Sequence, residues 1–324
     1  MCRGELHNQA MFDPAAFDLI DFGNCEVVPM LTRPLSAHVR ALLNVTFLSC
    51  MLLFAGEQLA QAQTASMGRQ NGADNEYQTG AILWTQSSAE YRALAYQTFS
   101  LARLVLDQAL RDQWTGRAHR RSGKAPAVIV DVDETVLDNS RYQAELVLRE
   151  SAYTPEGWQS WCDRADADAV PGAVEFLNYA YSRGVHVFYI TNRGRAEKAG
   201  TIANLRKLGF PKVSEETVMI REAGVIASKE SRRQKVGTRY RIVLLIGDNL
   251  NDFNDHFAGK SIADRKTQVD RERREFGSRF ILLPNPMYGD WENAINEKKS
   301  NLTDAERRAN RRAALKGISI QSDP

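Results

Sequence analysis

The chain has 324 residues, of which 43% are hydrophobic and 25% are charged. These proportions allow one large or two modest globular domains, and they exclude a fibrous, collagen-like or wholly disordered protein. The formal net charge is +2, and the part from Gln63 onward carries 39 basic and 34 acidic residues. Such a mild excess suits a small anionic substrate. A duplex-binding protein concentrates its basic residues in one stripe, so we expect no nucleic acid partner.

Residues 1–62 carry the pattern of an N-terminal extension and signal peptide. An uncharged apolar stretch lies between Arg40 and Glu57, basic residues precede it, and Ala60-Gln61-Ala62 follows it. This order predicts a secretory signal that is cleaved after Ala62, and therefore a periplasmic or secreted protein. The stretch is short and polar for a spanning helix. Because the signal begins late in the chain, Met30 is an alternative start.

Cys50 leaves a second export route open. Leu48-Ser49-Cys50 lies within the apolar run in the manner that marks bacterial lipoproteins, so an outer membrane lipoprotein is the alternative. In that case the protein contacts a membrane only through its lipid. The residues that follow Cys50 are apolar, whereas a lipid-anchored cysteine normally opens a polar tether. Only Cys162 lies in the predicted mature chain, which excludes an intrachain disulfide there.

The mature chain divides into four segments. Residues 63–75 are polar and contain glycine, which predicts a flexible leader. Residues 76–114 repeat apolar side chains at helical spacing, and two packed helices are expected. Residues 126–295 alternate short apolar runs with helical stretches. Residues 296–324 are rich in Lys and Arg and are expected to form a frayed helix and a basic tail.

The apolar runs predict the fold class. They are rich in Val, Ile and Leu and span Ala127–Val132, Val185–Thr191, Thr217–Ile220, Arg241–Gly247 and Arg279–Leu283. Near-continuous apolar strands are typical of a parallel sheet that is buried on both faces. We therefore expect an α/β domain in which helices sandwich a parallel sheet.

Asp131 and Asp133 stand at the end of the first predicted strand. Two residues with one residue between them on an extended segment point to the same face, so both can serve a site at that strand end. For an isolated Asp-x-Asp, two solvated carboxylates in a turn are the simpler interpretation.

Further polar groups follow the other predicted strands. Thr191 and Asn192 lie at and just beyond the end of the second strand, and Lys229 follows the third. A Gly-Asp-x-x-x-Asp motif from Gly247 to Asp252 starts at the end of the fourth. Taken alone, these are a helix cap, a solvated lysine and a turn. Because ligands of parallel sheets bind beyond the carboxyl ends of the strands, the whole set predicts one site at one edge of the sheet.

In these motifs the chain resembles the haloacid dehalogenase superfamily, and within it the bacterial class C acid phosphatases of the lipoprotein 5'-nucleotidase type. The resemblance rests on the run from Asp131 to Asn139, on the run from Gly247 to Phe253 and on the segment 87–91, and it covers residues 80–295. It implies a Rossmann-like parallel sheet with a small helical cap, here expected within residues 138–170 together with the N-terminal helices. It also implies a magnesium-dependent acid phosphatase acting on small-molecule phosphate monoesters.

The resemblance implies how the aspartates act. Asp131 is expected to attack phosphorus and to form an aspartyl phosphate. Asp131, Asp248 and the backbone carbonyl of Asp133 are expected to bind Mg²⁺, which prefers oxygen ligands. Asp133 is expected to serve as general acid and then as general base, which implies an acidic pH optimum.

The resemblance also implies how the phosphate is held. Lys229, the hydroxyl of Thr191 and backbone N–H groups of a helix that starts after Asn192 are expected to bind its oxygens. Asp252 is expected to orient Lys229, or alternatively to reach a metal-bound water.

Aromatic side chains are candidates for substrate selection. Tyr153, Trp158 and Trp161 lie in the expected cap, and Tyr288 lies near the end of the domain. Two tryptophans three residues apart on a helix are more often core packing than a stacking surface. In the related family an aromatic pair sandwiches a nucleobase, so Trp158 or Trp161, with Tyr288, are the expected contacts. Nucleoside monophosphates are therefore the favoured substrates.

Two other functions stay open. The first is a phosphatase or phosphotransferase for another substrate class, such as sugar phosphates. The second is a periplasmic binding protein without catalysis, which the complete motif set disfavours because a binder needs no proton donor at Asp133. The sequence fixes neither the physiological substrate nor the oligomeric state, and a homodimer is one alternative.

Overall fold

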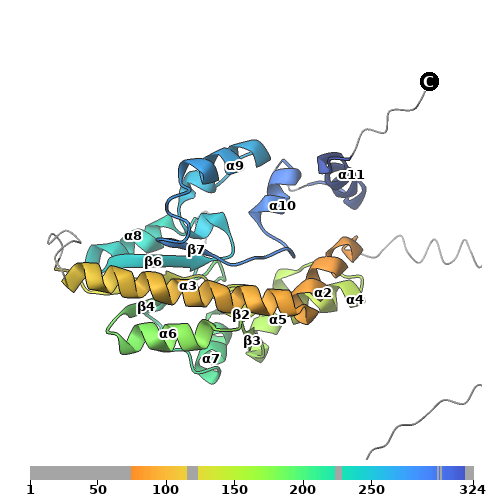
Figure 1. Cartoon of the computed structure of the whole chain (residues 1–324). Coiled ribbons are helices and arrows are strands. Elements are labelled where there is room, and N and C mark those ends of the chain that lie inside the picture. Colours follow the sequence, from red (N-terminus) through yellow and green to blue (C-terminus); the bar gives the residue numbers. More distant parts are fainter. Residues whose placement is uncertain (1–73, 115–122, 223–227, 298, 300, 318–324) are drawn as a thin grey trace, which may run out of the picture. The chain divides into compact units, whose positions relative to one another are not determined.

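A computed structural model describes residues 74–114, 123–222, 228–297, 299 and 301–317 (Figure 1). The predicted signal peptide and almost all of the predicted leader lie outside the described residues. Among the described helices, none combines the length and the apolar composition that crossing a bilayer requires.

Five parallel strands form the central sheet, in the order β5-β4-β1-β6-β7. Their bounds are β1 Pro126–Val130, β4 His186–Ile190, β5 Val218–Met219, β6 Arg241–Gly247 and β7 Phe280–Leu282. Each strand overlaps one of the five predicted apolar runs. The predicted parallel α/β sheet is therefore confirmed.

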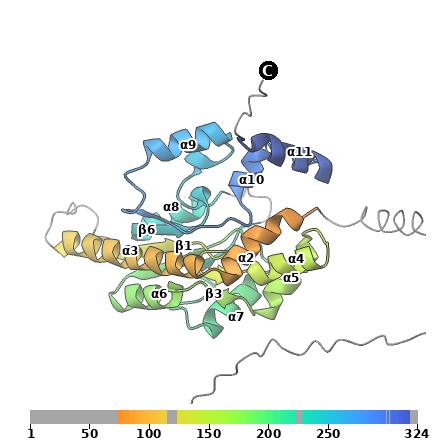
Figure 2. The ribbon, with the colours of Figure 1, turned by 45° about the vertical axis from the view of Figure 1, so that its right-hand side comes forward.

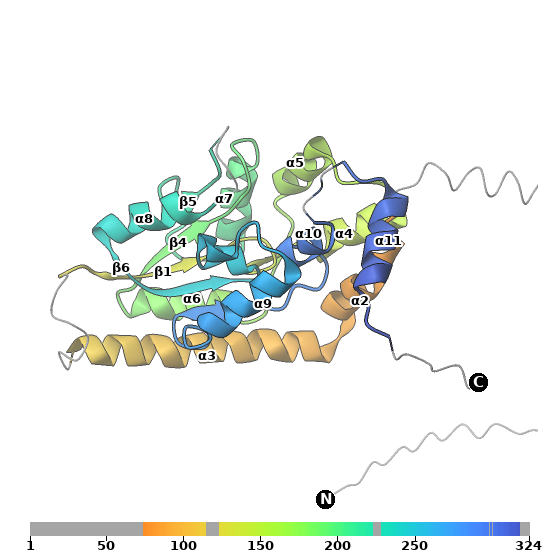
Figure 3. The same ribbon diagram turned by 90° about the horizontal axis from the view of Figure 1, so that it is seen from above.

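Alternate residues of the central strand β1 face opposite cores. Val128 and Val130 pack in a core that includes buried residues of α3 (Ala89–Trp114) and α6 (Ala173–Ser182), whereas Ala127 and Ile129 pack with Val236 of α8 (Glu230–Arg239). Figure 3 shows α3 and α6 on one side of the sheet and α8 on the other. Because side chains alternate along a strand, this burial on both faces explains the near-continuous apolar runs.

The segment predicted as a cap begins inside the run from Asp131 to Asn139, beyond the end of β1. Its ends pair as a small antiparallel sheet of β2 (Leu137–Asp138) and β3 (Asp168–Ala169), with α4 (Ser140–Leu148) and α5 (Pro155–Arg164) between them. Thr154 caps α5 by accepting a hydrogen bond from the Gly157 N–H. In Figure 2 α4 and α5 lie beside α2 (Thr79–Ser87), which contacts α4. On the other side α5 packs against α7 (Lys198–Lys207).

The remaining elements are short. They are η2 (Glu76–Gln78) before α2, and η3 (Leu250–Asp252), η4 (Asp255–Phe257), α9 (Ile262–Arg271), α10 (Asp290–Ile295) and α11 (Asp304–Ala314) after β6.

The segment predicted as a basic tail contains α11, and α11 is tied to the first described residues. Arg308 and Arg311 each form an ion pair with Asp74 at 2.9 Å. The Arg311 guanidinium also lies 3.6 Å from the centre of the Tyr77 ring. A cation over an aromatic face adds to the attraction of the ion pairs. These contacts, here called the Asp74–α11 contact, join the two ends of the described chain.

Candidate active site

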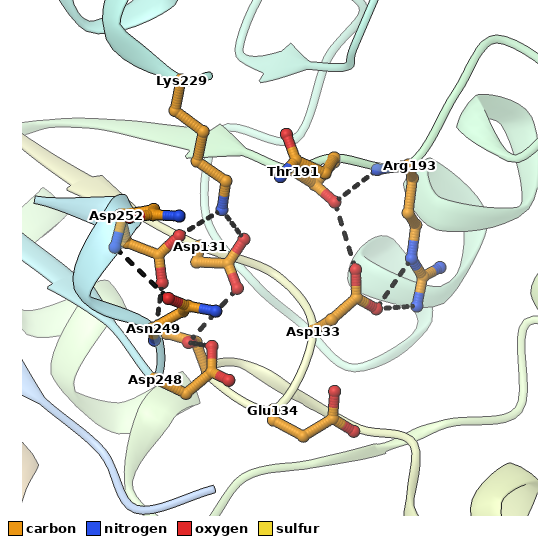
Figure 4. A network of polar contacts seen from close by, with 12 residues as sticks. Asp131, Asp133, Glu134, Thr191, Arg193, Lys229, Asp248, Asn249 and Asp252 are labelled. Atoms are coloured by element: carbon orange, nitrogen blue, oxygen red, sulfur yellow. Dashed lines mark hydrogen bonds and ion pairs between the residues drawn. The ribbon is translucent and has the colours of Figure 1, made fainter. Parts of the chain in front are cut away.

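The four predicted motifs meet beyond the carboxyl ends of β1, β4 and β6 (Figure 4). Asp131 follows β1, Thr191 follows β4 and Asp248 follows β6, while Lys229 is the residue that precedes α8. A cavity of about 840 Å³ opens here, and its lining includes Asp131, Asp133, Asn192, Lys229, Asp248 and Asp252. The sheet therefore gathers carboxylates and an ammonium group that are far apart in the sequence.

Lys229 binds two carboxylates in the floor of this cavity. Its Nζ donates to Asp131 Oδ1 and to Asp252 Oδ1, the second at 2.7 Å, and all three side chains are buried. Burial alone would lower the pKa of Lys229, but the two carboxylates outweigh it and raise that pKa above its ordinary value. The lysine therefore keeps a fixed positive charge beside Asp131.

A glycine allows Asp252 to reach this lysine. A β-carbon at position 247 would overlap the Asp252 side chain, so the loop after β6 folds back only because Gly247 has none. Asp252 Oδ2 also accepts the Asn249 N–H at 2.9 Å, within a capping box at the start of η3. Asp252 is thus held between Asn249 and Lys229, which gives its predicted orienting role a physical basis.

A cluster of three carboxylates could hold a metal ion. Oxygen atoms of Asp131, Asp248 and Asp252 lie within 4.8 Å of one another. Burial, reinforced by the neighbouring carboxylates, raises the pKa of Asp248 to about 7 and the pKa of Asp131 well above its ordinary value. Because buried oxygen donors that repel one another suit a divalent cation, these residues fit the predicted metal. The side chain of Asp133 is not in the cluster, and its metal contact through the backbone carbonyl stays a prediction.

The Asp133 carboxylate faces the opposite side of the site. Its Oδ1 accepts hydrogen bonds from Arg193 Nε at 3.0 Å, Arg193 Nη2 at 2.8 Å and Asn139 Nδ2 at 2.9 Å. Its Oδ2 accepts the Thr191 hydroxyl at 3.2 Å. Figure 4 shows Asp133 turned toward Thr191 and Arg193. Thr191 is fully buried, and its hydroxyl also accepts the Arg193 N–H.

Asn192 lines the cavity, but no helix starts directly behind it. The next helix, α7, begins at Lys198, and a loop from Arg193 to Glu197 lies between. The predicted helix N-terminus at the phosphate site is therefore wrong. Instead, Asn192 Oδ1 accepts a hydrogen bond from Arg232 Nη2 at 2.9 Å, which brings a guanidinium of α8 to this loop.

Arg193 is a site residue without a predicted role. It is 4% exposed, and beyond Asp133 it donates to Thr201 Oγ1 at 3.0 Å and to Asn139 Oδ1 at 3.2 Å. Its guanidinium carbon lies 5.1 Å from the centre of the Trp158 ring. In the sequence, only its position directly after Thr191-Asn192 indicated that Arg193 belongs to the site. Arginine side chains are mostly exposed, so the sequence alone favours a solvated side chain.

Replacing Arg193 with methionine should lower the free energy of unfolding by about 2–4 kcal/mol, because Asp133 and Asn139 lose their shared partner. The turnover of alkyl phosphates should also fall more than that of p-nitrophenyl phosphate, since only poor leaving groups need a positioned proton donor. Urea denaturation and paired kinetics measure the two effects. Arg193→Lys keeps the charge without the bidentate contact and should be intermediate. An unchanged ratio of the two turnover numbers would contradict the link to Asp133.

In the structure, three of the four aromatic candidates line the cavity and one is buried in the core. Trp158 and Tyr288 line the cavity, and so does Tyr153. Trp161 is buried in the larger core, where its Nε1 donates to Asn139 Oδ1 at 2.9 Å. The predicted alternative that Trp161 stacks on substrate is therefore wrong, because both its ring and its N–H are used inside the domain.

This fold, with its carboxylate cluster, threonine and lysine at one sheet edge, is that of the haloacid-dehalogenase-like proteins. The family model of the HAD superfamily, subfamily IIIB (acid phosphatase), matches residues 50–291. The chain belongs to this family, which confirms the predicted resemblance.

The solved structures and curated proteins that are similar to this chain include acid phosphatases. The structure of the class C acid phosphatase from Bacillus anthracis is 40% identical, with a TM-score of 0.70 over 75% of this chain and 98% of that chain. A crystal structure of class C acid phosphatase from Bacillus anthracis with tungstate bound is 39% identical, with a TM-score of 0.70 over 76% and 99%. The stem 31 kDa glycoprotein of Glycine max is 27% identical, and acid phosphatase 1 of Solanum lycopersicum is 25% identical, each over 49% of this chain. The matches span 58% and 57% of these two relatives.

Proposed function

We propose that this protein is an acid phosphatase that hydrolyses phosphate monoesters. The observation that carries the proposal is the meeting of Asp131, Asp248 and Lys229 in one cavity at the carboxyl edge of the sheet. Family membership supports it. The relative from Bacillus anthracis with tungstate bound supports it further, since tungstate, like phosphate, is an oxyanion.

Mg²⁺ is the proposed cofactor, held by Asp131 and Asp248 together with the backbone carbonyl of Asp133. When bound, the cation screens the repulsion between an attacking carboxylate and the anionic phosphate. Lys229 supplies a second, permanent positive charge next to Asp131.

The reaction follows in two displacements. A carboxylate oxygen of Asp131 bonds to phosphorus while the bond from phosphorus to the ester oxygen breaks, and Asp133 gives its proton to that oxygen. Water then attacks the aspartyl phosphate and passes a proton to Asp133, which releases phosphate and restores Asp131. Arg193 and Asn139 occupy Oδ1 of Asp133. Among the described residues only Thr191 donates a hydrogen bond to Oδ2, so Oδ2 is the oxygen that can carry the transferred proton.

Mg²⁺ should raise the melting temperature more at pH 8 than at pH 5. The pKa of Asp248 is about 7 against an ordinary 3.8, so below pH 7 the carboxyl holds a proton that the cation must displace. One displaced proton weakens the apparent affinity about tenfold for each pH unit below 7. In the metal-free protein the same raised pKa means that stability falls as the pH rises from 3.8 through 7, since the unfolded chain has already lost this proton.

Thermal unfolding in a magnesium series at both pH values measures this effect. Asp248→Asn is the control, and its response to Mg²⁺ should be small throughout. An equal shift of the wild-type protein at pH 5 and pH 8 would remove Asp248 from the metal site.

Nucleoside monophosphates are the proposed substrate class, because the aromatic side chains of Trp158 and Tyr288 line the same cavity. Trp158→Ala should raise the KM for adenosine 5'-monophosphate about tenfold, which is the loss expected for one base stacked on an aromatic ring. The KM for a small alkyl phosphate should not change. Equal kcat/KM of the wild-type protein on nucleotide and sugar phosphates would instead favour the sugar phosphatase alternative.

Export is a separate proposal. Processing after Ala62 yields a periplasmic or secreted enzyme, and a lipid on Cys50 yields an outer membrane lipoprotein. The mass of the mature N-terminal peptide distinguishes the two.

A further inference from the structure

A second cavity, of about 550 Å³, lies beside the catalytic one, at the place where α9, α10 and α11 meet. These three helices lie together in Figure 1. Its charged lining consists of Lys260, Arg265, Lys299 and Arg307 against the single carboxylate Asp290. This excess of cations in the lining favours an anionic ligand.

Among the residues that line the cavity, Asp290 is the one carboxylate that faces the four cationic side chains. Arg265 is 9% exposed, and its Nη1 is fixed by the Phe257 carbonyl at 3.1 Å. Asp290 already accepts amide hydrogen bonds from Asn293, at 3.1 Å, and from Asn251. The guanidinium of Arg265 is held in place, and the oxygens of Asp290 already accept hydrogen bonds from two amides. A guanidinium in such a position can bind a phosphoryl group through two parallel hydrogen bonds.

Two carboxylates that do not line the cavity, Glu297 and Asp304, pair with two of the four cations, so the group as a whole keeps an excess of one positive charge. Lys299 pairs with Glu297 at 2.9 Å and Arg307 pairs with Asp304 at 3.4 Å, and every side chain in these pairs is more than a third exposed. Ion pairs in contact with water are weak, so an entering phosphoryl group can compete for both cations.

The second cavity adjoins the catalytic one. Asp290 and Arg307 line both. The family match ends at residue 291, so Lys299 and Arg307 come from chain beyond the matched domain. The C-terminal segment thus adds cations to a site whose catalytic groups belong to the family domain.

We propose that this second cavity binds a phosphoryl group other than the one that is hydrolysed. The proposal rests on the proposed phosphatase function and narrows its substrates to monoesters that carry a second phosphoryl group. Free inorganic phosphate has the same chemistry and is the other source of the ligand. At mildly acidic pH a phosphate monoester keeps at least one negative charge, so the site stays functional under the conditions expected for the enzyme.

Kinetics with matched substrates test the first source. The mature chain with Mg²⁺ should have a KM about five- to tenfold lower for adenosine 3',5'-bisphosphate than for adenosine 5'-monophosphate, the gain expected from one additional set of charged contacts. The double variant Lys260→Glu with Lys299→Glu should lose this preference without a change in kcat for the monophosphate. The matched control is Lys266→Glu with Arg273→Glu, which makes the same charge change at exposed positions in and just after α9.

Calorimetry with inorganic phosphate tests the second source and does not depend on turnover. The titration uses the Asp131→Asn protein in EDTA, alone and combined with each pair of substitutions. If the Lys260/Lys299 variant loses phosphate binding and the control pair does not, the result supports the second site. If the wild-type protein hydrolyses neither nucleotide, the proposed function is wrong, but the calorimetric result still stands. If the Lys260/Lys299 variant changes the ratio of the two KM values, the bound phosphoryl group is part of the substrate. If it changes only the calorimetric binding of inorganic phosphate, the ligand is free phosphate. If neither quantity differs from the control pair, the second site is overturned.

Discussion

Replacing Asp131 with asparagine should lower kcat by at least about 10⁴-fold, the scale on which enzymes lose activity when their nucleophile is removed. The amide has nearly the shape of the carboxylate, so the fold should be kept. It cannot, however, form the bond to phosphorus. Magnesium-dependent release of p-nitrophenol by the mature chain measures the loss.

Asp133→Asn provides the contrast. Its nucleophile is intact, and p-nitrophenol leaves without a proton donor, so this variant should show a burst of p-nitrophenol followed by slow turnover. The burst is absent when Asp131 is replaced. Equal activity of Asp131→Asn and the wild-type protein would end the assignment of the nucleophile.

Lys229→Met should lower kcat about 10²–10³-fold, the range for loss of one electrostatic contact to the transition state. The variant should also lose about 3–5 kcal/mol of unfolding free energy without metal, because two buried carboxylates lose their counter-charge. Asp131 and Asp252 are the groups left unpaired. Steady-state kinetics and urea denaturation measure the two losses.

The matched control is Lys235→Met, which removes an exposed lysine from the same helix α8. It should match the wild-type protein in both assays. Mg²⁺ should restore part of the stability of Lys229→Met, since the cation compensates the same carboxylates. Wild-type turnover in Lys229→Met would exclude the lysine from catalysis.

The strands and the convergence of the motifs were predictable because both follow from local patterns. A strand buried on both faces reads as a continuous apolar run, and parallel strands bring the residues that follow them to one edge. The positions of Asp131, Thr191 and Asp248 required no further information. The fold class was confirmed for the same reason.

The features of the site that could not be predicted depend on contacts between segments that are distant in the sequence. Trp158 and Trp161 are one helical turn apart, and only the packing of α5 decides that one faces the cavity while the other binds Asn139. From the sequence alone, Arg193 is expected to be solvated. In the fold its guanidinium is buried and donates hydrogen bonds to Asp133 and Thr201. The start of α7 was misplaced because the loop before it is defined by tertiary contacts and not by composition.

The Asp74–α11 contact has a consequence for how such an enzyme diversifies. Asp74 and Arg311 both belong to the wall of the catalytic cavity, although neither lies in a catalytic motif. Substitutions at either residue can therefore change which molecules enter the cavity, while the groups that break the phosphate ester stay as they are. Selectivity and chemistry can thus vary independently in this fold.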